Sequence, residues 1–214
     1  MNKLVGELDF GHHASWEGVD MEGYVLRWYD HWLKGEENGV GEERPVRIFV
    51  MGENVWRDEK EWPLARTRYM KYFMRGGGSA NSGEGDGWLS EKPPKDEPSD
   101  RFVYDPMNPV PTKGGLLCCN HTFNPGGPYD QSEIESRMDV LVYSTPRLER
   151  NTEVTGPVVV KLFASSMAVD TDFTAKLVDV WPCGAAMLRT DGIVRARYRE
   201  TLERPKLIEP GRVY

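Results

Sequence analysis

Histidine is the side chain best suited to act as a base or a metal ligand near neutral pH, and this chain has four. His12 and His13 stand next to Gly11 in a short polar string, and we interpret them as loop residues rather than as a catalytic base. His31 directly follows Asp30. Consecutive residues of a helix point in different directions, so these two side chains do not form an acid/base pair. The histidines alone therefore identify no active site.

The three cysteines also limit the possible chemistry. Cys118 and Cys119 are adjacent and Cys183 lies far along the chain, which provides neither a disulfide framework nor a zinc site. A bond between adjacent cysteines closes a strained ring, so two reduced thiols are the favoured interpretation and a redox-active pair is the alternative. His121 is near enough in sequence to suggest a Cys–His nucleophile, but no third group that would orient it can be named. We expect no metal and no cofactor.

The serine-rich strings lack the context that a nucleophilic serine requires. Such a serine usually lies in G-x-S-x-G, on a sharp turn between a strand and a helix, and this motif does not occur here. The string GGGSANSGEG at 76–85 precedes no helical pattern, so its serines are interpreted as loop residues. The motifs H-E-x-x-H and G-x-x-x-x-G-K-[ST] are absent, as is G-x-G-x-x-G between a strand and a helix. We therefore predict no catalytic, cofactor-binding or metal-binding residue in this chain.

Charged residues near the C-terminus form two patterns. Asp170 and Asp172 stand two apart and could present both carboxylates at one strand end, but one pair offers too few oxygens for calcium. Further on, three arginines alternate with apolar residues: Arg195, Arg197 and Arg199. This alternation places their guanidinium groups on one face of a strand. We expect them to pair with carboxylates of a neighbouring strand, such as Asp179, rather than to bind phosphate.

The first element that would position such residues is a helix at 19–34. Apolar side chains recur there at spacings of three and four and form one wide face: Met21, Val25, Trp28, Tyr29, Trp32 and Leu33. Gly35 supplies the C-terminal stop. The short segment before the helix is too small to cover this face, and the string after it is rich in Gly and Glu. We expect the partner of this face to lie upstream, outside this chain.

Most of the remaining patterns predict strands. β-branched and aromatic residues, or strict alternation, mark the following segments: 46–52, 69–74, 87–90, 101–105, 138–144, 153–165, 172–182 and 192–200. In 172–182, Phe173, Ala175 and Leu177 alternate with polar residues, which predicts a half-buried strand. The string VVVKLF within 153–165 is apolar on both faces, as in a strand between two layers. Residues 76–100, between the predicted strands 69–74 and 101–105, are expected to form a loop-rich insertion on the surface. We predict a β-sandwich, of jelly-roll rather than immunoglobulin type because its connections are long and uneven.

Composition excludes several classes of protein. The 214 residues carry a formal net charge of −7, which argues against nucleic acid as a partner because that affinity depends on basic side chains. No apolar run approaches the roughly 18 residues that span a bilayer, and the polar start has no signal-peptide core. The sequence therefore indicates no membrane partner, and it leaves the localisation open with the cytoplasm as the default.

Longer strings carry a resemblance to a known family. VGELDFGHHA, RWYDHWLKGEENGV and RPVRIFVMGENVWRDEKEWPLARTR resemble the segment that follows the active-site histidine in the cocaine-esterase and Xaa-Pro dipeptidyl-peptidase group of serine hydrolases. The string from 127 to 184 and DGIVRARYRE are similar to the C-terminal, non-catalytic jelly-roll domain of that group. The likeness covers nearly the whole chain and is weakest at 76–100.

The resemblance implies an enzyme that cleaves esters or amides of acyl, aminoacyl or X-Pro type through a Ser-Asp-His triad and an acyl-enzyme, without a cofactor. It implies that residues 1–40 end the α/β-hydrolase domain and that 41–214 form the jelly roll without its last strands. No triad residue maps onto this chain, so we expect the chain alone to be inactive. It further implies a small ester or peptide substrate for the full-length enzyme and possible homo-oligomers.

An alternative from another class remains open at this point. The chain could be a stand-alone β-sandwich module that binds carbohydrate or protein. Four tryptophans would supply stacking surfaces for sugars: Trp56, Trp62, Trp88 and Trp181. The competing interpretation of these residues is that they belong to the core.

Overall fold

The computed structural model describes residues 3–117 and 125–214, and these form two compact units. The N-terminal unit comprises Met1–Tyr72 together with Arg147–Pro157. The C-terminal unit comprises Phe73–Pro146 and Val158–Tyr214. The chain therefore passes from one unit to the other more than once. The interpretations of Cys118, Cys119 and His121 fall outside the described residues.

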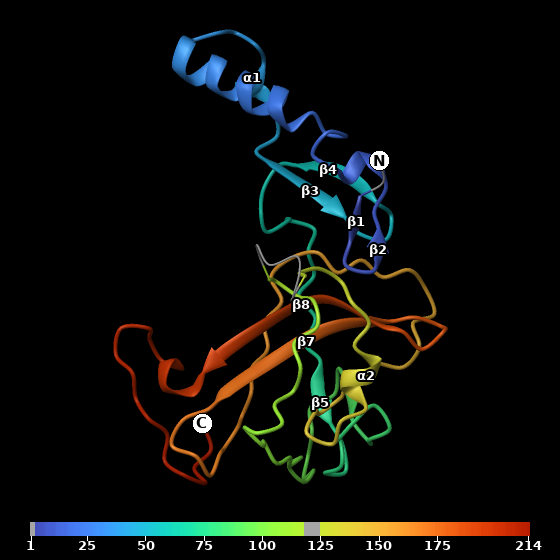
Figure 1. Cartoon of the computed structure of the whole chain (residues 1–214), viewed down its shortest axis with the longest axis vertical. Helices are drawn as coiled ribbons and strands as arrows, with labels where there is room; N and C mark the ends of the chain where they lie inside the picture. The colour runs from blue at the N-terminus through green and yellow to red at the C-terminus, as the bar shows by residue number, and fades with distance from the viewer. Residues whose placement is uncertain (1–2, 118–124) are drawn as a thin grey trace. The chain divides into compact units, whose positions relative to one another are not determined.

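The N-terminal unit contains two small hairpins and one long helix. Its elements are β1 (Leu4–Val5), β2 (Leu8–Asp9), the short 3₁₀ helix η1 (His12–Ala14), α1 (Met21–Lys34), η2 (Val40–Glu42), β3 (Val46–Val50) and β4 (Val55–Glu59). β1 pairs with β2 and β3 with β4, both antiparallel. Phe10 packs edge-on against Phe49 with ring centroids 5.8 Å apart. This aromatic contact joins the loop after β2 to β3. The first turn of α1 lies near the β3–β4 hairpin, because Met21 and Tyr24 line a cavity together with Arg47 and Trp56, and the rest of the helix extends away from both hairpins (Figure 1).

The C-terminal unit is built on one long hairpin. Its elements are β5 (Phe73–Arg75), β6 (Trp88–Ser90), α2 (Ser132–Glu135), β7 (Asp172–Val180), β8 (Ala186–Arg195) and η3 (Ala196–Tyr198). β7 and β8 pair antiparallel from Asp172 opposite Arg195 to Val180 opposite Ala186, with a bulge between Leu177 and Val178. Figure 1 shows these two strands running side by side across the unit.

The buried centre of this unit lies where β8 begins. Ala186, Met187 and Leu188 are all under 4% exposed, and Ile134 of α2 is buried as well. The segment before α2 holds β8 in place because the N–H of Gln131 donates to the carbonyl of Ala186 at 2.8 Å. On β7, Phe173, Ala175 and Leu177 are half-buried and alternate with exposed residues as far as the bulge after Leu177, which confirms the predicted alternation.

The strand predictions succeed for one strand in each of three hairpins, and β4 was not predicted. β3, β6 and β7 lie within the predicted segments 46–52, 87–90 and 172–182. The predictions at 101–105 and 153–165 were wrong, since neither segment contains a strand in the structure. The segment 138–144 contributes only isolated bridges.

Three other expectations about the strands need correction. The prediction at 69–74 overlaps β5 only at its last two residues, because β5 is Phe73–Arg75. The prediction at 192–200 overlaps only the end of β8, which starts at Ala186 and ends at Arg195. The string VVVKLF, expected between two layers, is exposed. An apolar sequence alone does not make a strand; the backbone also needs a hydrogen-bonding partner.

The chain is therefore mainly β, with two-stranded antiparallel sheets and one long helix among the described residues. The jelly-roll arrangement stays a prediction. Residues 76–87 run without regular strand or helix up to β6, as expected for the loop-rich insertion. None of the helices in the described ranges is both long enough and apolar enough to cross a membrane.

Candidate functional site

Local sequence signals define the two ends of α1. Asp20 is the N-cap, and its carboxylate accepts a hydrogen bond from the N–H of Gly23 at 3.3 Å. At the other end Gly35 adopts a left-handed conformation with φ of 74°, and its N–H donates to the carbonyl of His31 at 3.0 Å. Lys34 also pairs with Asp30 one turn earlier, at 2.5 Å. The helix thus ends where the sequence predicts.

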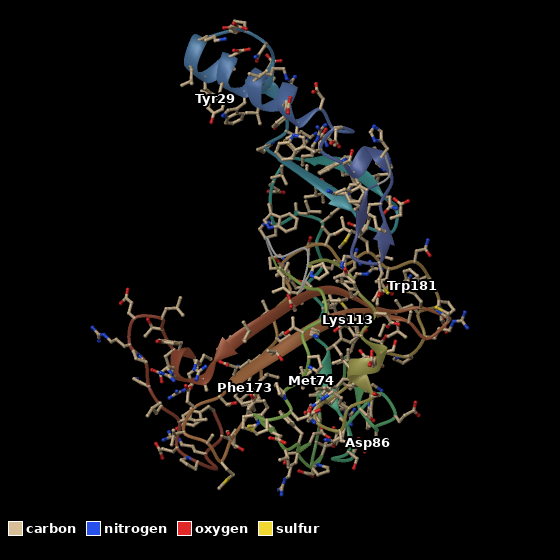
Figure 2. The ribbon with its side chains drawn as sticks, viewed as in Figure 1. Tyr29, Met74, Asp86, Lys113, Phe173 and Trp181 are labelled. Carbon is tan, nitrogen blue, oxygen red and sulfur yellow. The ribbon has the colours of Figure 1, made fainter. Side chains whose placement is uncertain are left out.

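No residue of α1 is buried. We use the name α1 apolar face for the six residues Met21, Val25, Trp28, Tyr29, Trp32 and Leu33. Five of them are at least 40% exposed, and Leu33 reaches 76%. Trp28 and Trp32 contact one another with ring centroids 5.8 Å apart. Figure 2 shows Tyr29 on this helix, where no other element lies against its side chain. This face is an apolar surface without a partner among the described residues, as the sequence predicts.

The polar side of α1 is engaged within the N-terminal unit. Asn38 donates its side-chain N–H to the carbonyl of Arg27 at 2.7 Å, and the Arg27 guanidinium pairs with Glu43 at 2.6 Å. The Nδ1 atom of His31 lies 2.9 Å from the carbonyl of Glu36. These contacts fasten the segment after the helix to the helix, and they leave the apolar face open.

Two of the histidines have structural contacts rather than a catalytic arrangement. The ring of His13 contacts the backbone carbonyl of Asn54, and its own carbonyl accepts a hydrogen bond from Trp56 Nε1 at 2.9 Å. His13 therefore fixes the loop after β2 to the β3–β4 turn. His31 contacts the backbone after α1 as described above. Neither contact includes a serine or cysteine nucleophile.

An ion-pair network joins β4 to the segment Arg147–Pro157. Arg57 forms two hydrogen bonds to the carboxylate of Glu153, at 2.9 and 2.6 Å, and Thr155 Oγ1 donates to the same carboxylate at 2.8 Å. These bonds lower the pKa of Glu153 to about 2, with Arg57 as the main cause. Next to this pair, the hydrogen bond from Arg66 lowers the pKa of Glu59. Arg57 thus links two carboxylates of the N-terminal unit, while its buried Nε, 3.1 Å from Glu59, makes no hydrogen bond to any described residue. The network holds two segments of this unit together.

The arginines at the end of β8 pair with carboxylates, but not with the predicted one. Arg195 and Arg197 both reach Asp170, at 2.8 and 2.6 Å, and Arg195 also contacts Asp172 at 3.2 Å. Asp179 pairs instead with Arg189, at 2.6 Å. The expected alternation also fails, because β8 ends at Arg195 and a 3₁₀ helix follows.

The third arginine of that pattern has a different role. Arg199 donates to the carbonyls of Ala196 and Lys206, at 3.0 and 2.6 Å, and its guanidinium lies 4.3 Å from the centre of the Tyr214 ring. It fastens the C-terminal segment to the end of β8. The two aspartates and three arginines thus form contacts within the protein, and the guanidinium groups of Arg195 and Arg197 converge on the carboxylate of Asp170.

The serines of GGGSANSGEG lie in a loop that Asp86 closes. The Asp86 carboxylate accepts hydrogen bonds from the N–H groups of Gly77 and Ser79, at 2.8 and 3.1 Å. Ser82 is buried, and its N–H donates to the carbonyl of Val140. The hydrogen bonds given above join the two serines to Asp86 and to a backbone carbonyl. This arrangement agrees with the interpretation of both serines as loop residues.

Sequence reasoning missed the most buried polar side chain, Gln131, which is 1% exposed. Its Nε2 donates to the carbonyls of Lys113 and Tyr129, at 2.9 and 3.0 Å, and its Oε1 accepts from Lys176 Nζ at 2.7 Å. Burial lowers the pKa of Lys176 and raises the pKa of nearby Glu135. No spacing signal could have identified Gln131, because its partners are two backbone carbonyls and a residue 45 positions away.

Three of the tryptophans proposed for sugar stacking contact other side chains of the protein. Trp56 packs edge-on against Phe49 at 5.2 Å, and Trp88 lies under the Arg75 guanidinium at 5.4 Å. Trp181, at the turn that joins β7 and β8 (Figure 2), donates its indole N–H to Asp179 at 3.2 Å. Within residues 3–117 and 125–214, no group of three or more His, Cys, Asp or Glu side chains is arranged to hold a metal ion.

Comparison with known proteins identifies the family. Residues 38–214 match the model of the X-Pro dipeptidyl-peptidase C-terminal non-catalytic domain. The chain belongs to this family. Within the family's relatives, cocaine esterase of Rhodococcus sp. (strain MB1 Bresler) is 50% identical over 186 residues. A putative Xaa-Pro dipeptidyl-peptidase of Bacillus cereus is 26% identical over 208 residues.

Two solved structures with similar folds support this assignment to the family. An aminopeptidase from a marine sediment Thaumarchaeota archaeon matches 99% of the chain with a TM-score of 0.74 and 27% identity. An α-amino acid ester hydrolase matches 89% of the chain with a TM-score of 0.70 and 26% identity. The chain spans about a third of each protein: 32% of the cocaine esterase and 34% of the aminopeptidase. It corresponds to the C-terminal, non-catalytic domain of the cocaine-esterase and Xaa-Pro dipeptidyl-peptidase group of serine hydrolases.

Proposed function

We propose that this chain is the non-catalytic part of a serine hydrolase that cleaves esters or amides of acyl, aminoacyl or X-Pro type. The Ser-Asp-His triad of that enzyme lies outside the third of the protein that this chain represents. The observation that carries the proposal is the 50% identity to a cocaine esterase across 87% of the chain. That identity favours an ester substrate, whereas the similarity to Xaa-Pro dipeptidyl-peptidases supports an amide substrate.

The α1 apolar face gives this proposal a physical basis. Two tryptophans, a tyrosine and a leucine on one exposed face represent a large apolar area in contact with water. Burial of even three such side chains would contribute about 5 kcal/mol, at roughly 1.5–3 kcal/mol each. In the proposed enzyme this face packs on the α/β-hydrolase domain, to which residues 1–40 belong, and residues 41–214 form a jelly-roll sandwich.

The first test assays the purified chain on p-nitrophenyl esters and on X-Pro-nitroanilides. We expect no turnover of either class, because no triad can be assembled from its described residues. A rate that disappears when one internal serine is changed to alanine would contradict the external triad.

The second test replaces the matched third of the Rhodococcus cocaine esterase by this chain. We expect the chimera to hydrolyse esters, and a version with Trp28→Glu and Trp32→Glu to lose assembly and activity together. An inactive but fully folded chimera would count against the proposed role, and activity that survives both substitutions would count against the docking face.

A further inference from the structure

The turn after α1 contains the only asparagine in the sequence that precedes a glycine, Asn38–Gly39. The backbone nitrogen of the residue after an asparagine is able to attack the side-chain amide carbon and form a cyclic imide. A side chain on that next residue hinders the attack, whereas glycine has no Cβ and lets the backbone approach closely. Asparagine is one of the thermolabile residues of proteins. This turn is therefore the part of the sequence best suited to deamidation.

The structure leaves the attacking group free and holds the amide beside it. Gly39 has a φ of 81°, and a Cβ there would meet nothing within 4 Å, so the turn has room for the imide. Among the described residues, no group accepts a hydrogen bond from the Gly39 N–H. The Oδ1 atom of Asn38 accepts from the N–H of Val40 at 3.3 Å. This bond keeps the side-chain amide next to the backbone nitrogen that would attack it.

The same amide fastens the turn to α1. The Nδ2 atom of Asn38 donates to the carbonyl of Arg27 at 2.7 Å. A carboxylate in place of the amide has no N–H to donate, so two acceptors would face one another. It would also add a negative charge to residues 36–43, which already include four glutamates. Conversion of this one amide to a carboxylate therefore removes a contact that holds the turn against the helix.

We propose that Asn38 is a site of spontaneous deamidation and that the reaction irreversibly releases residues 36–43 from α1. The Gly39 nitrogen forms a bond to Cγ of Asn38, and the bond from Cγ to the side-chain nitrogen breaks. That nitrogen leaves as ammonia and takes up, through water, the proton that Gly39 loses. Water then opens the imide at its side-chain carbonyl to give aspartate, or at its backbone carbonyl to give isoaspartate. Both products carry a carboxylate, and the side-chain donor to Arg27 is lost in both.

Incubation of the chain at mildly alkaline pH, followed by peptide mass mapping, tests the reaction. We expect the peptide with Asn38 to gain the mass difference between OH and NH₂ faster than the peptides with Asn54 and Asn151, which precede valine and threonine. Gly39→Ala should slow the reaction to the rate of these two, because its Cβ hinders the attack. Circular dichroism checks the fold of this variant, and the comparison of the three asparagines needs no variant. Equal rates at all three would overturn the proposed site.

Asn38→Asp reproduces one of the two products and tests the release. Hydrogen exchange of residues 36–43 should rise in this variant and in the incubated chain, relative to the fresh chain. Asn54→Asp is the matched control, because it adds the same charge in the same unit and keeps the Oδ1 atom that accepts from the N–H of Gly52 at 3.2 Å. Unchanged exchange of residues 36–43 in Asn38→Asp would overturn the release, and so would an equal rise in Asn54→Asp.

Discussion

At the scale of single residues, Glu153 makes stability depend on pH. Its pKa of about 2 in the folded protein lies below the ordinary value of 4.5. The stabilisation it provides is therefore complete above about pH 4.5 and is lost as the pH falls towards 2. Glu153 is 44% exposed, so solvent screening limits the contribution of its pair with Arg57 to about 0.5–1 kcal/mol.

Glu153→Gln should lower the free energy of unfolding by about 0.5–1 kcal/mol at pH 7. The difference from the unsubstituted chain should shrink steadily between pH 4.5 and 2. Denaturant titrations at a series of pH values measure it. Glu149→Gln is the control, because Glu149 is an exposed carboxylate of the same segment. A difference that stays constant down to pH 2 would show that Glu153 acts through packing instead of charge.

How far the sequence predicts individual roles depends on the distance between partners. Gly35 ends a helix whose residues are its own neighbours, so its role was predicted from the sequence. The start was not: the helix begins at Met21, after the N-cap Asp20, and not at residue 19 as expected. Arg195 was expected to find a carboxylate, and it does. The sequence did not indicate which carboxylate, because that depends on where β8 ends and where the loop with Asp170 returns.

At the scale of elements, the α1 apolar face should control the solubility of the chain. Trp28→Glu and Trp32→Glu each replace an exposed indole, so we expect less binding of hydrophobic dyes and less association without loss of fold. Light scattering and dye fluorescence measure both effects. Lys34→Gln serves as a control on the same helix, because it changes a charge outside the apolar face. Unfolding by either glutamate would mean that another part of the chain covers the face.

The end of α1 should depend on the backbone conformation of Gly35. Its φ of 74° is strained for other residues, and a Cβ there would meet nothing within 4 Å. Gly35→Ala should therefore destabilise the last turn by about 1 kcal/mol through conformation alone. Gly192 on β8 is the matched control, since it also has open space but no left-handed φ. Hydrogen exchange of the last turn should rise in Gly35→Ala and stay unchanged in Gly192→Ala.

The elements also show why some strands were predicted and others were not. In the hairpin β3–β4 the apolar pattern predicted β3, whereas β4, with the sequence VWRDE, was not predicted. The segment 153–165 has a strong strand pattern, but no neighbour in sequence can pair with it. Strand formation there depends on a distant backbone partner, which a single sequence does not specify.

At the scale of the whole molecule, the division into two compact units should govern how the chain opens. The Glu153 pair lies within the N-terminal unit, whereas Asp170 joins Arg195 and Arg197 within the C-terminal unit. A substitution that removes contacts in one unit should raise the hydrogen exchange of the backbone amides of that unit. We expect Glu153→Gln to raise hydrogen exchange in the N-terminal unit, and Asp170→Asn to raise it in the C-terminal unit.

Hydrogen exchange followed by mass spectrometry resolves both responses in one experiment. Asp172→Asn is the control for the second substitution, because Asp172 is 41% exposed and makes a longer contact to Arg195, at 3.2 Å. It should raise exchange less than Asp170→Asn does. If either substitution in Glu153 or Asp170 raised exchange equally in both units, the chain would open as one cooperative body. Separate responses would instead mean that the N-terminal unit and the C-terminal unit open independently, each with its own cooperative set of contacts.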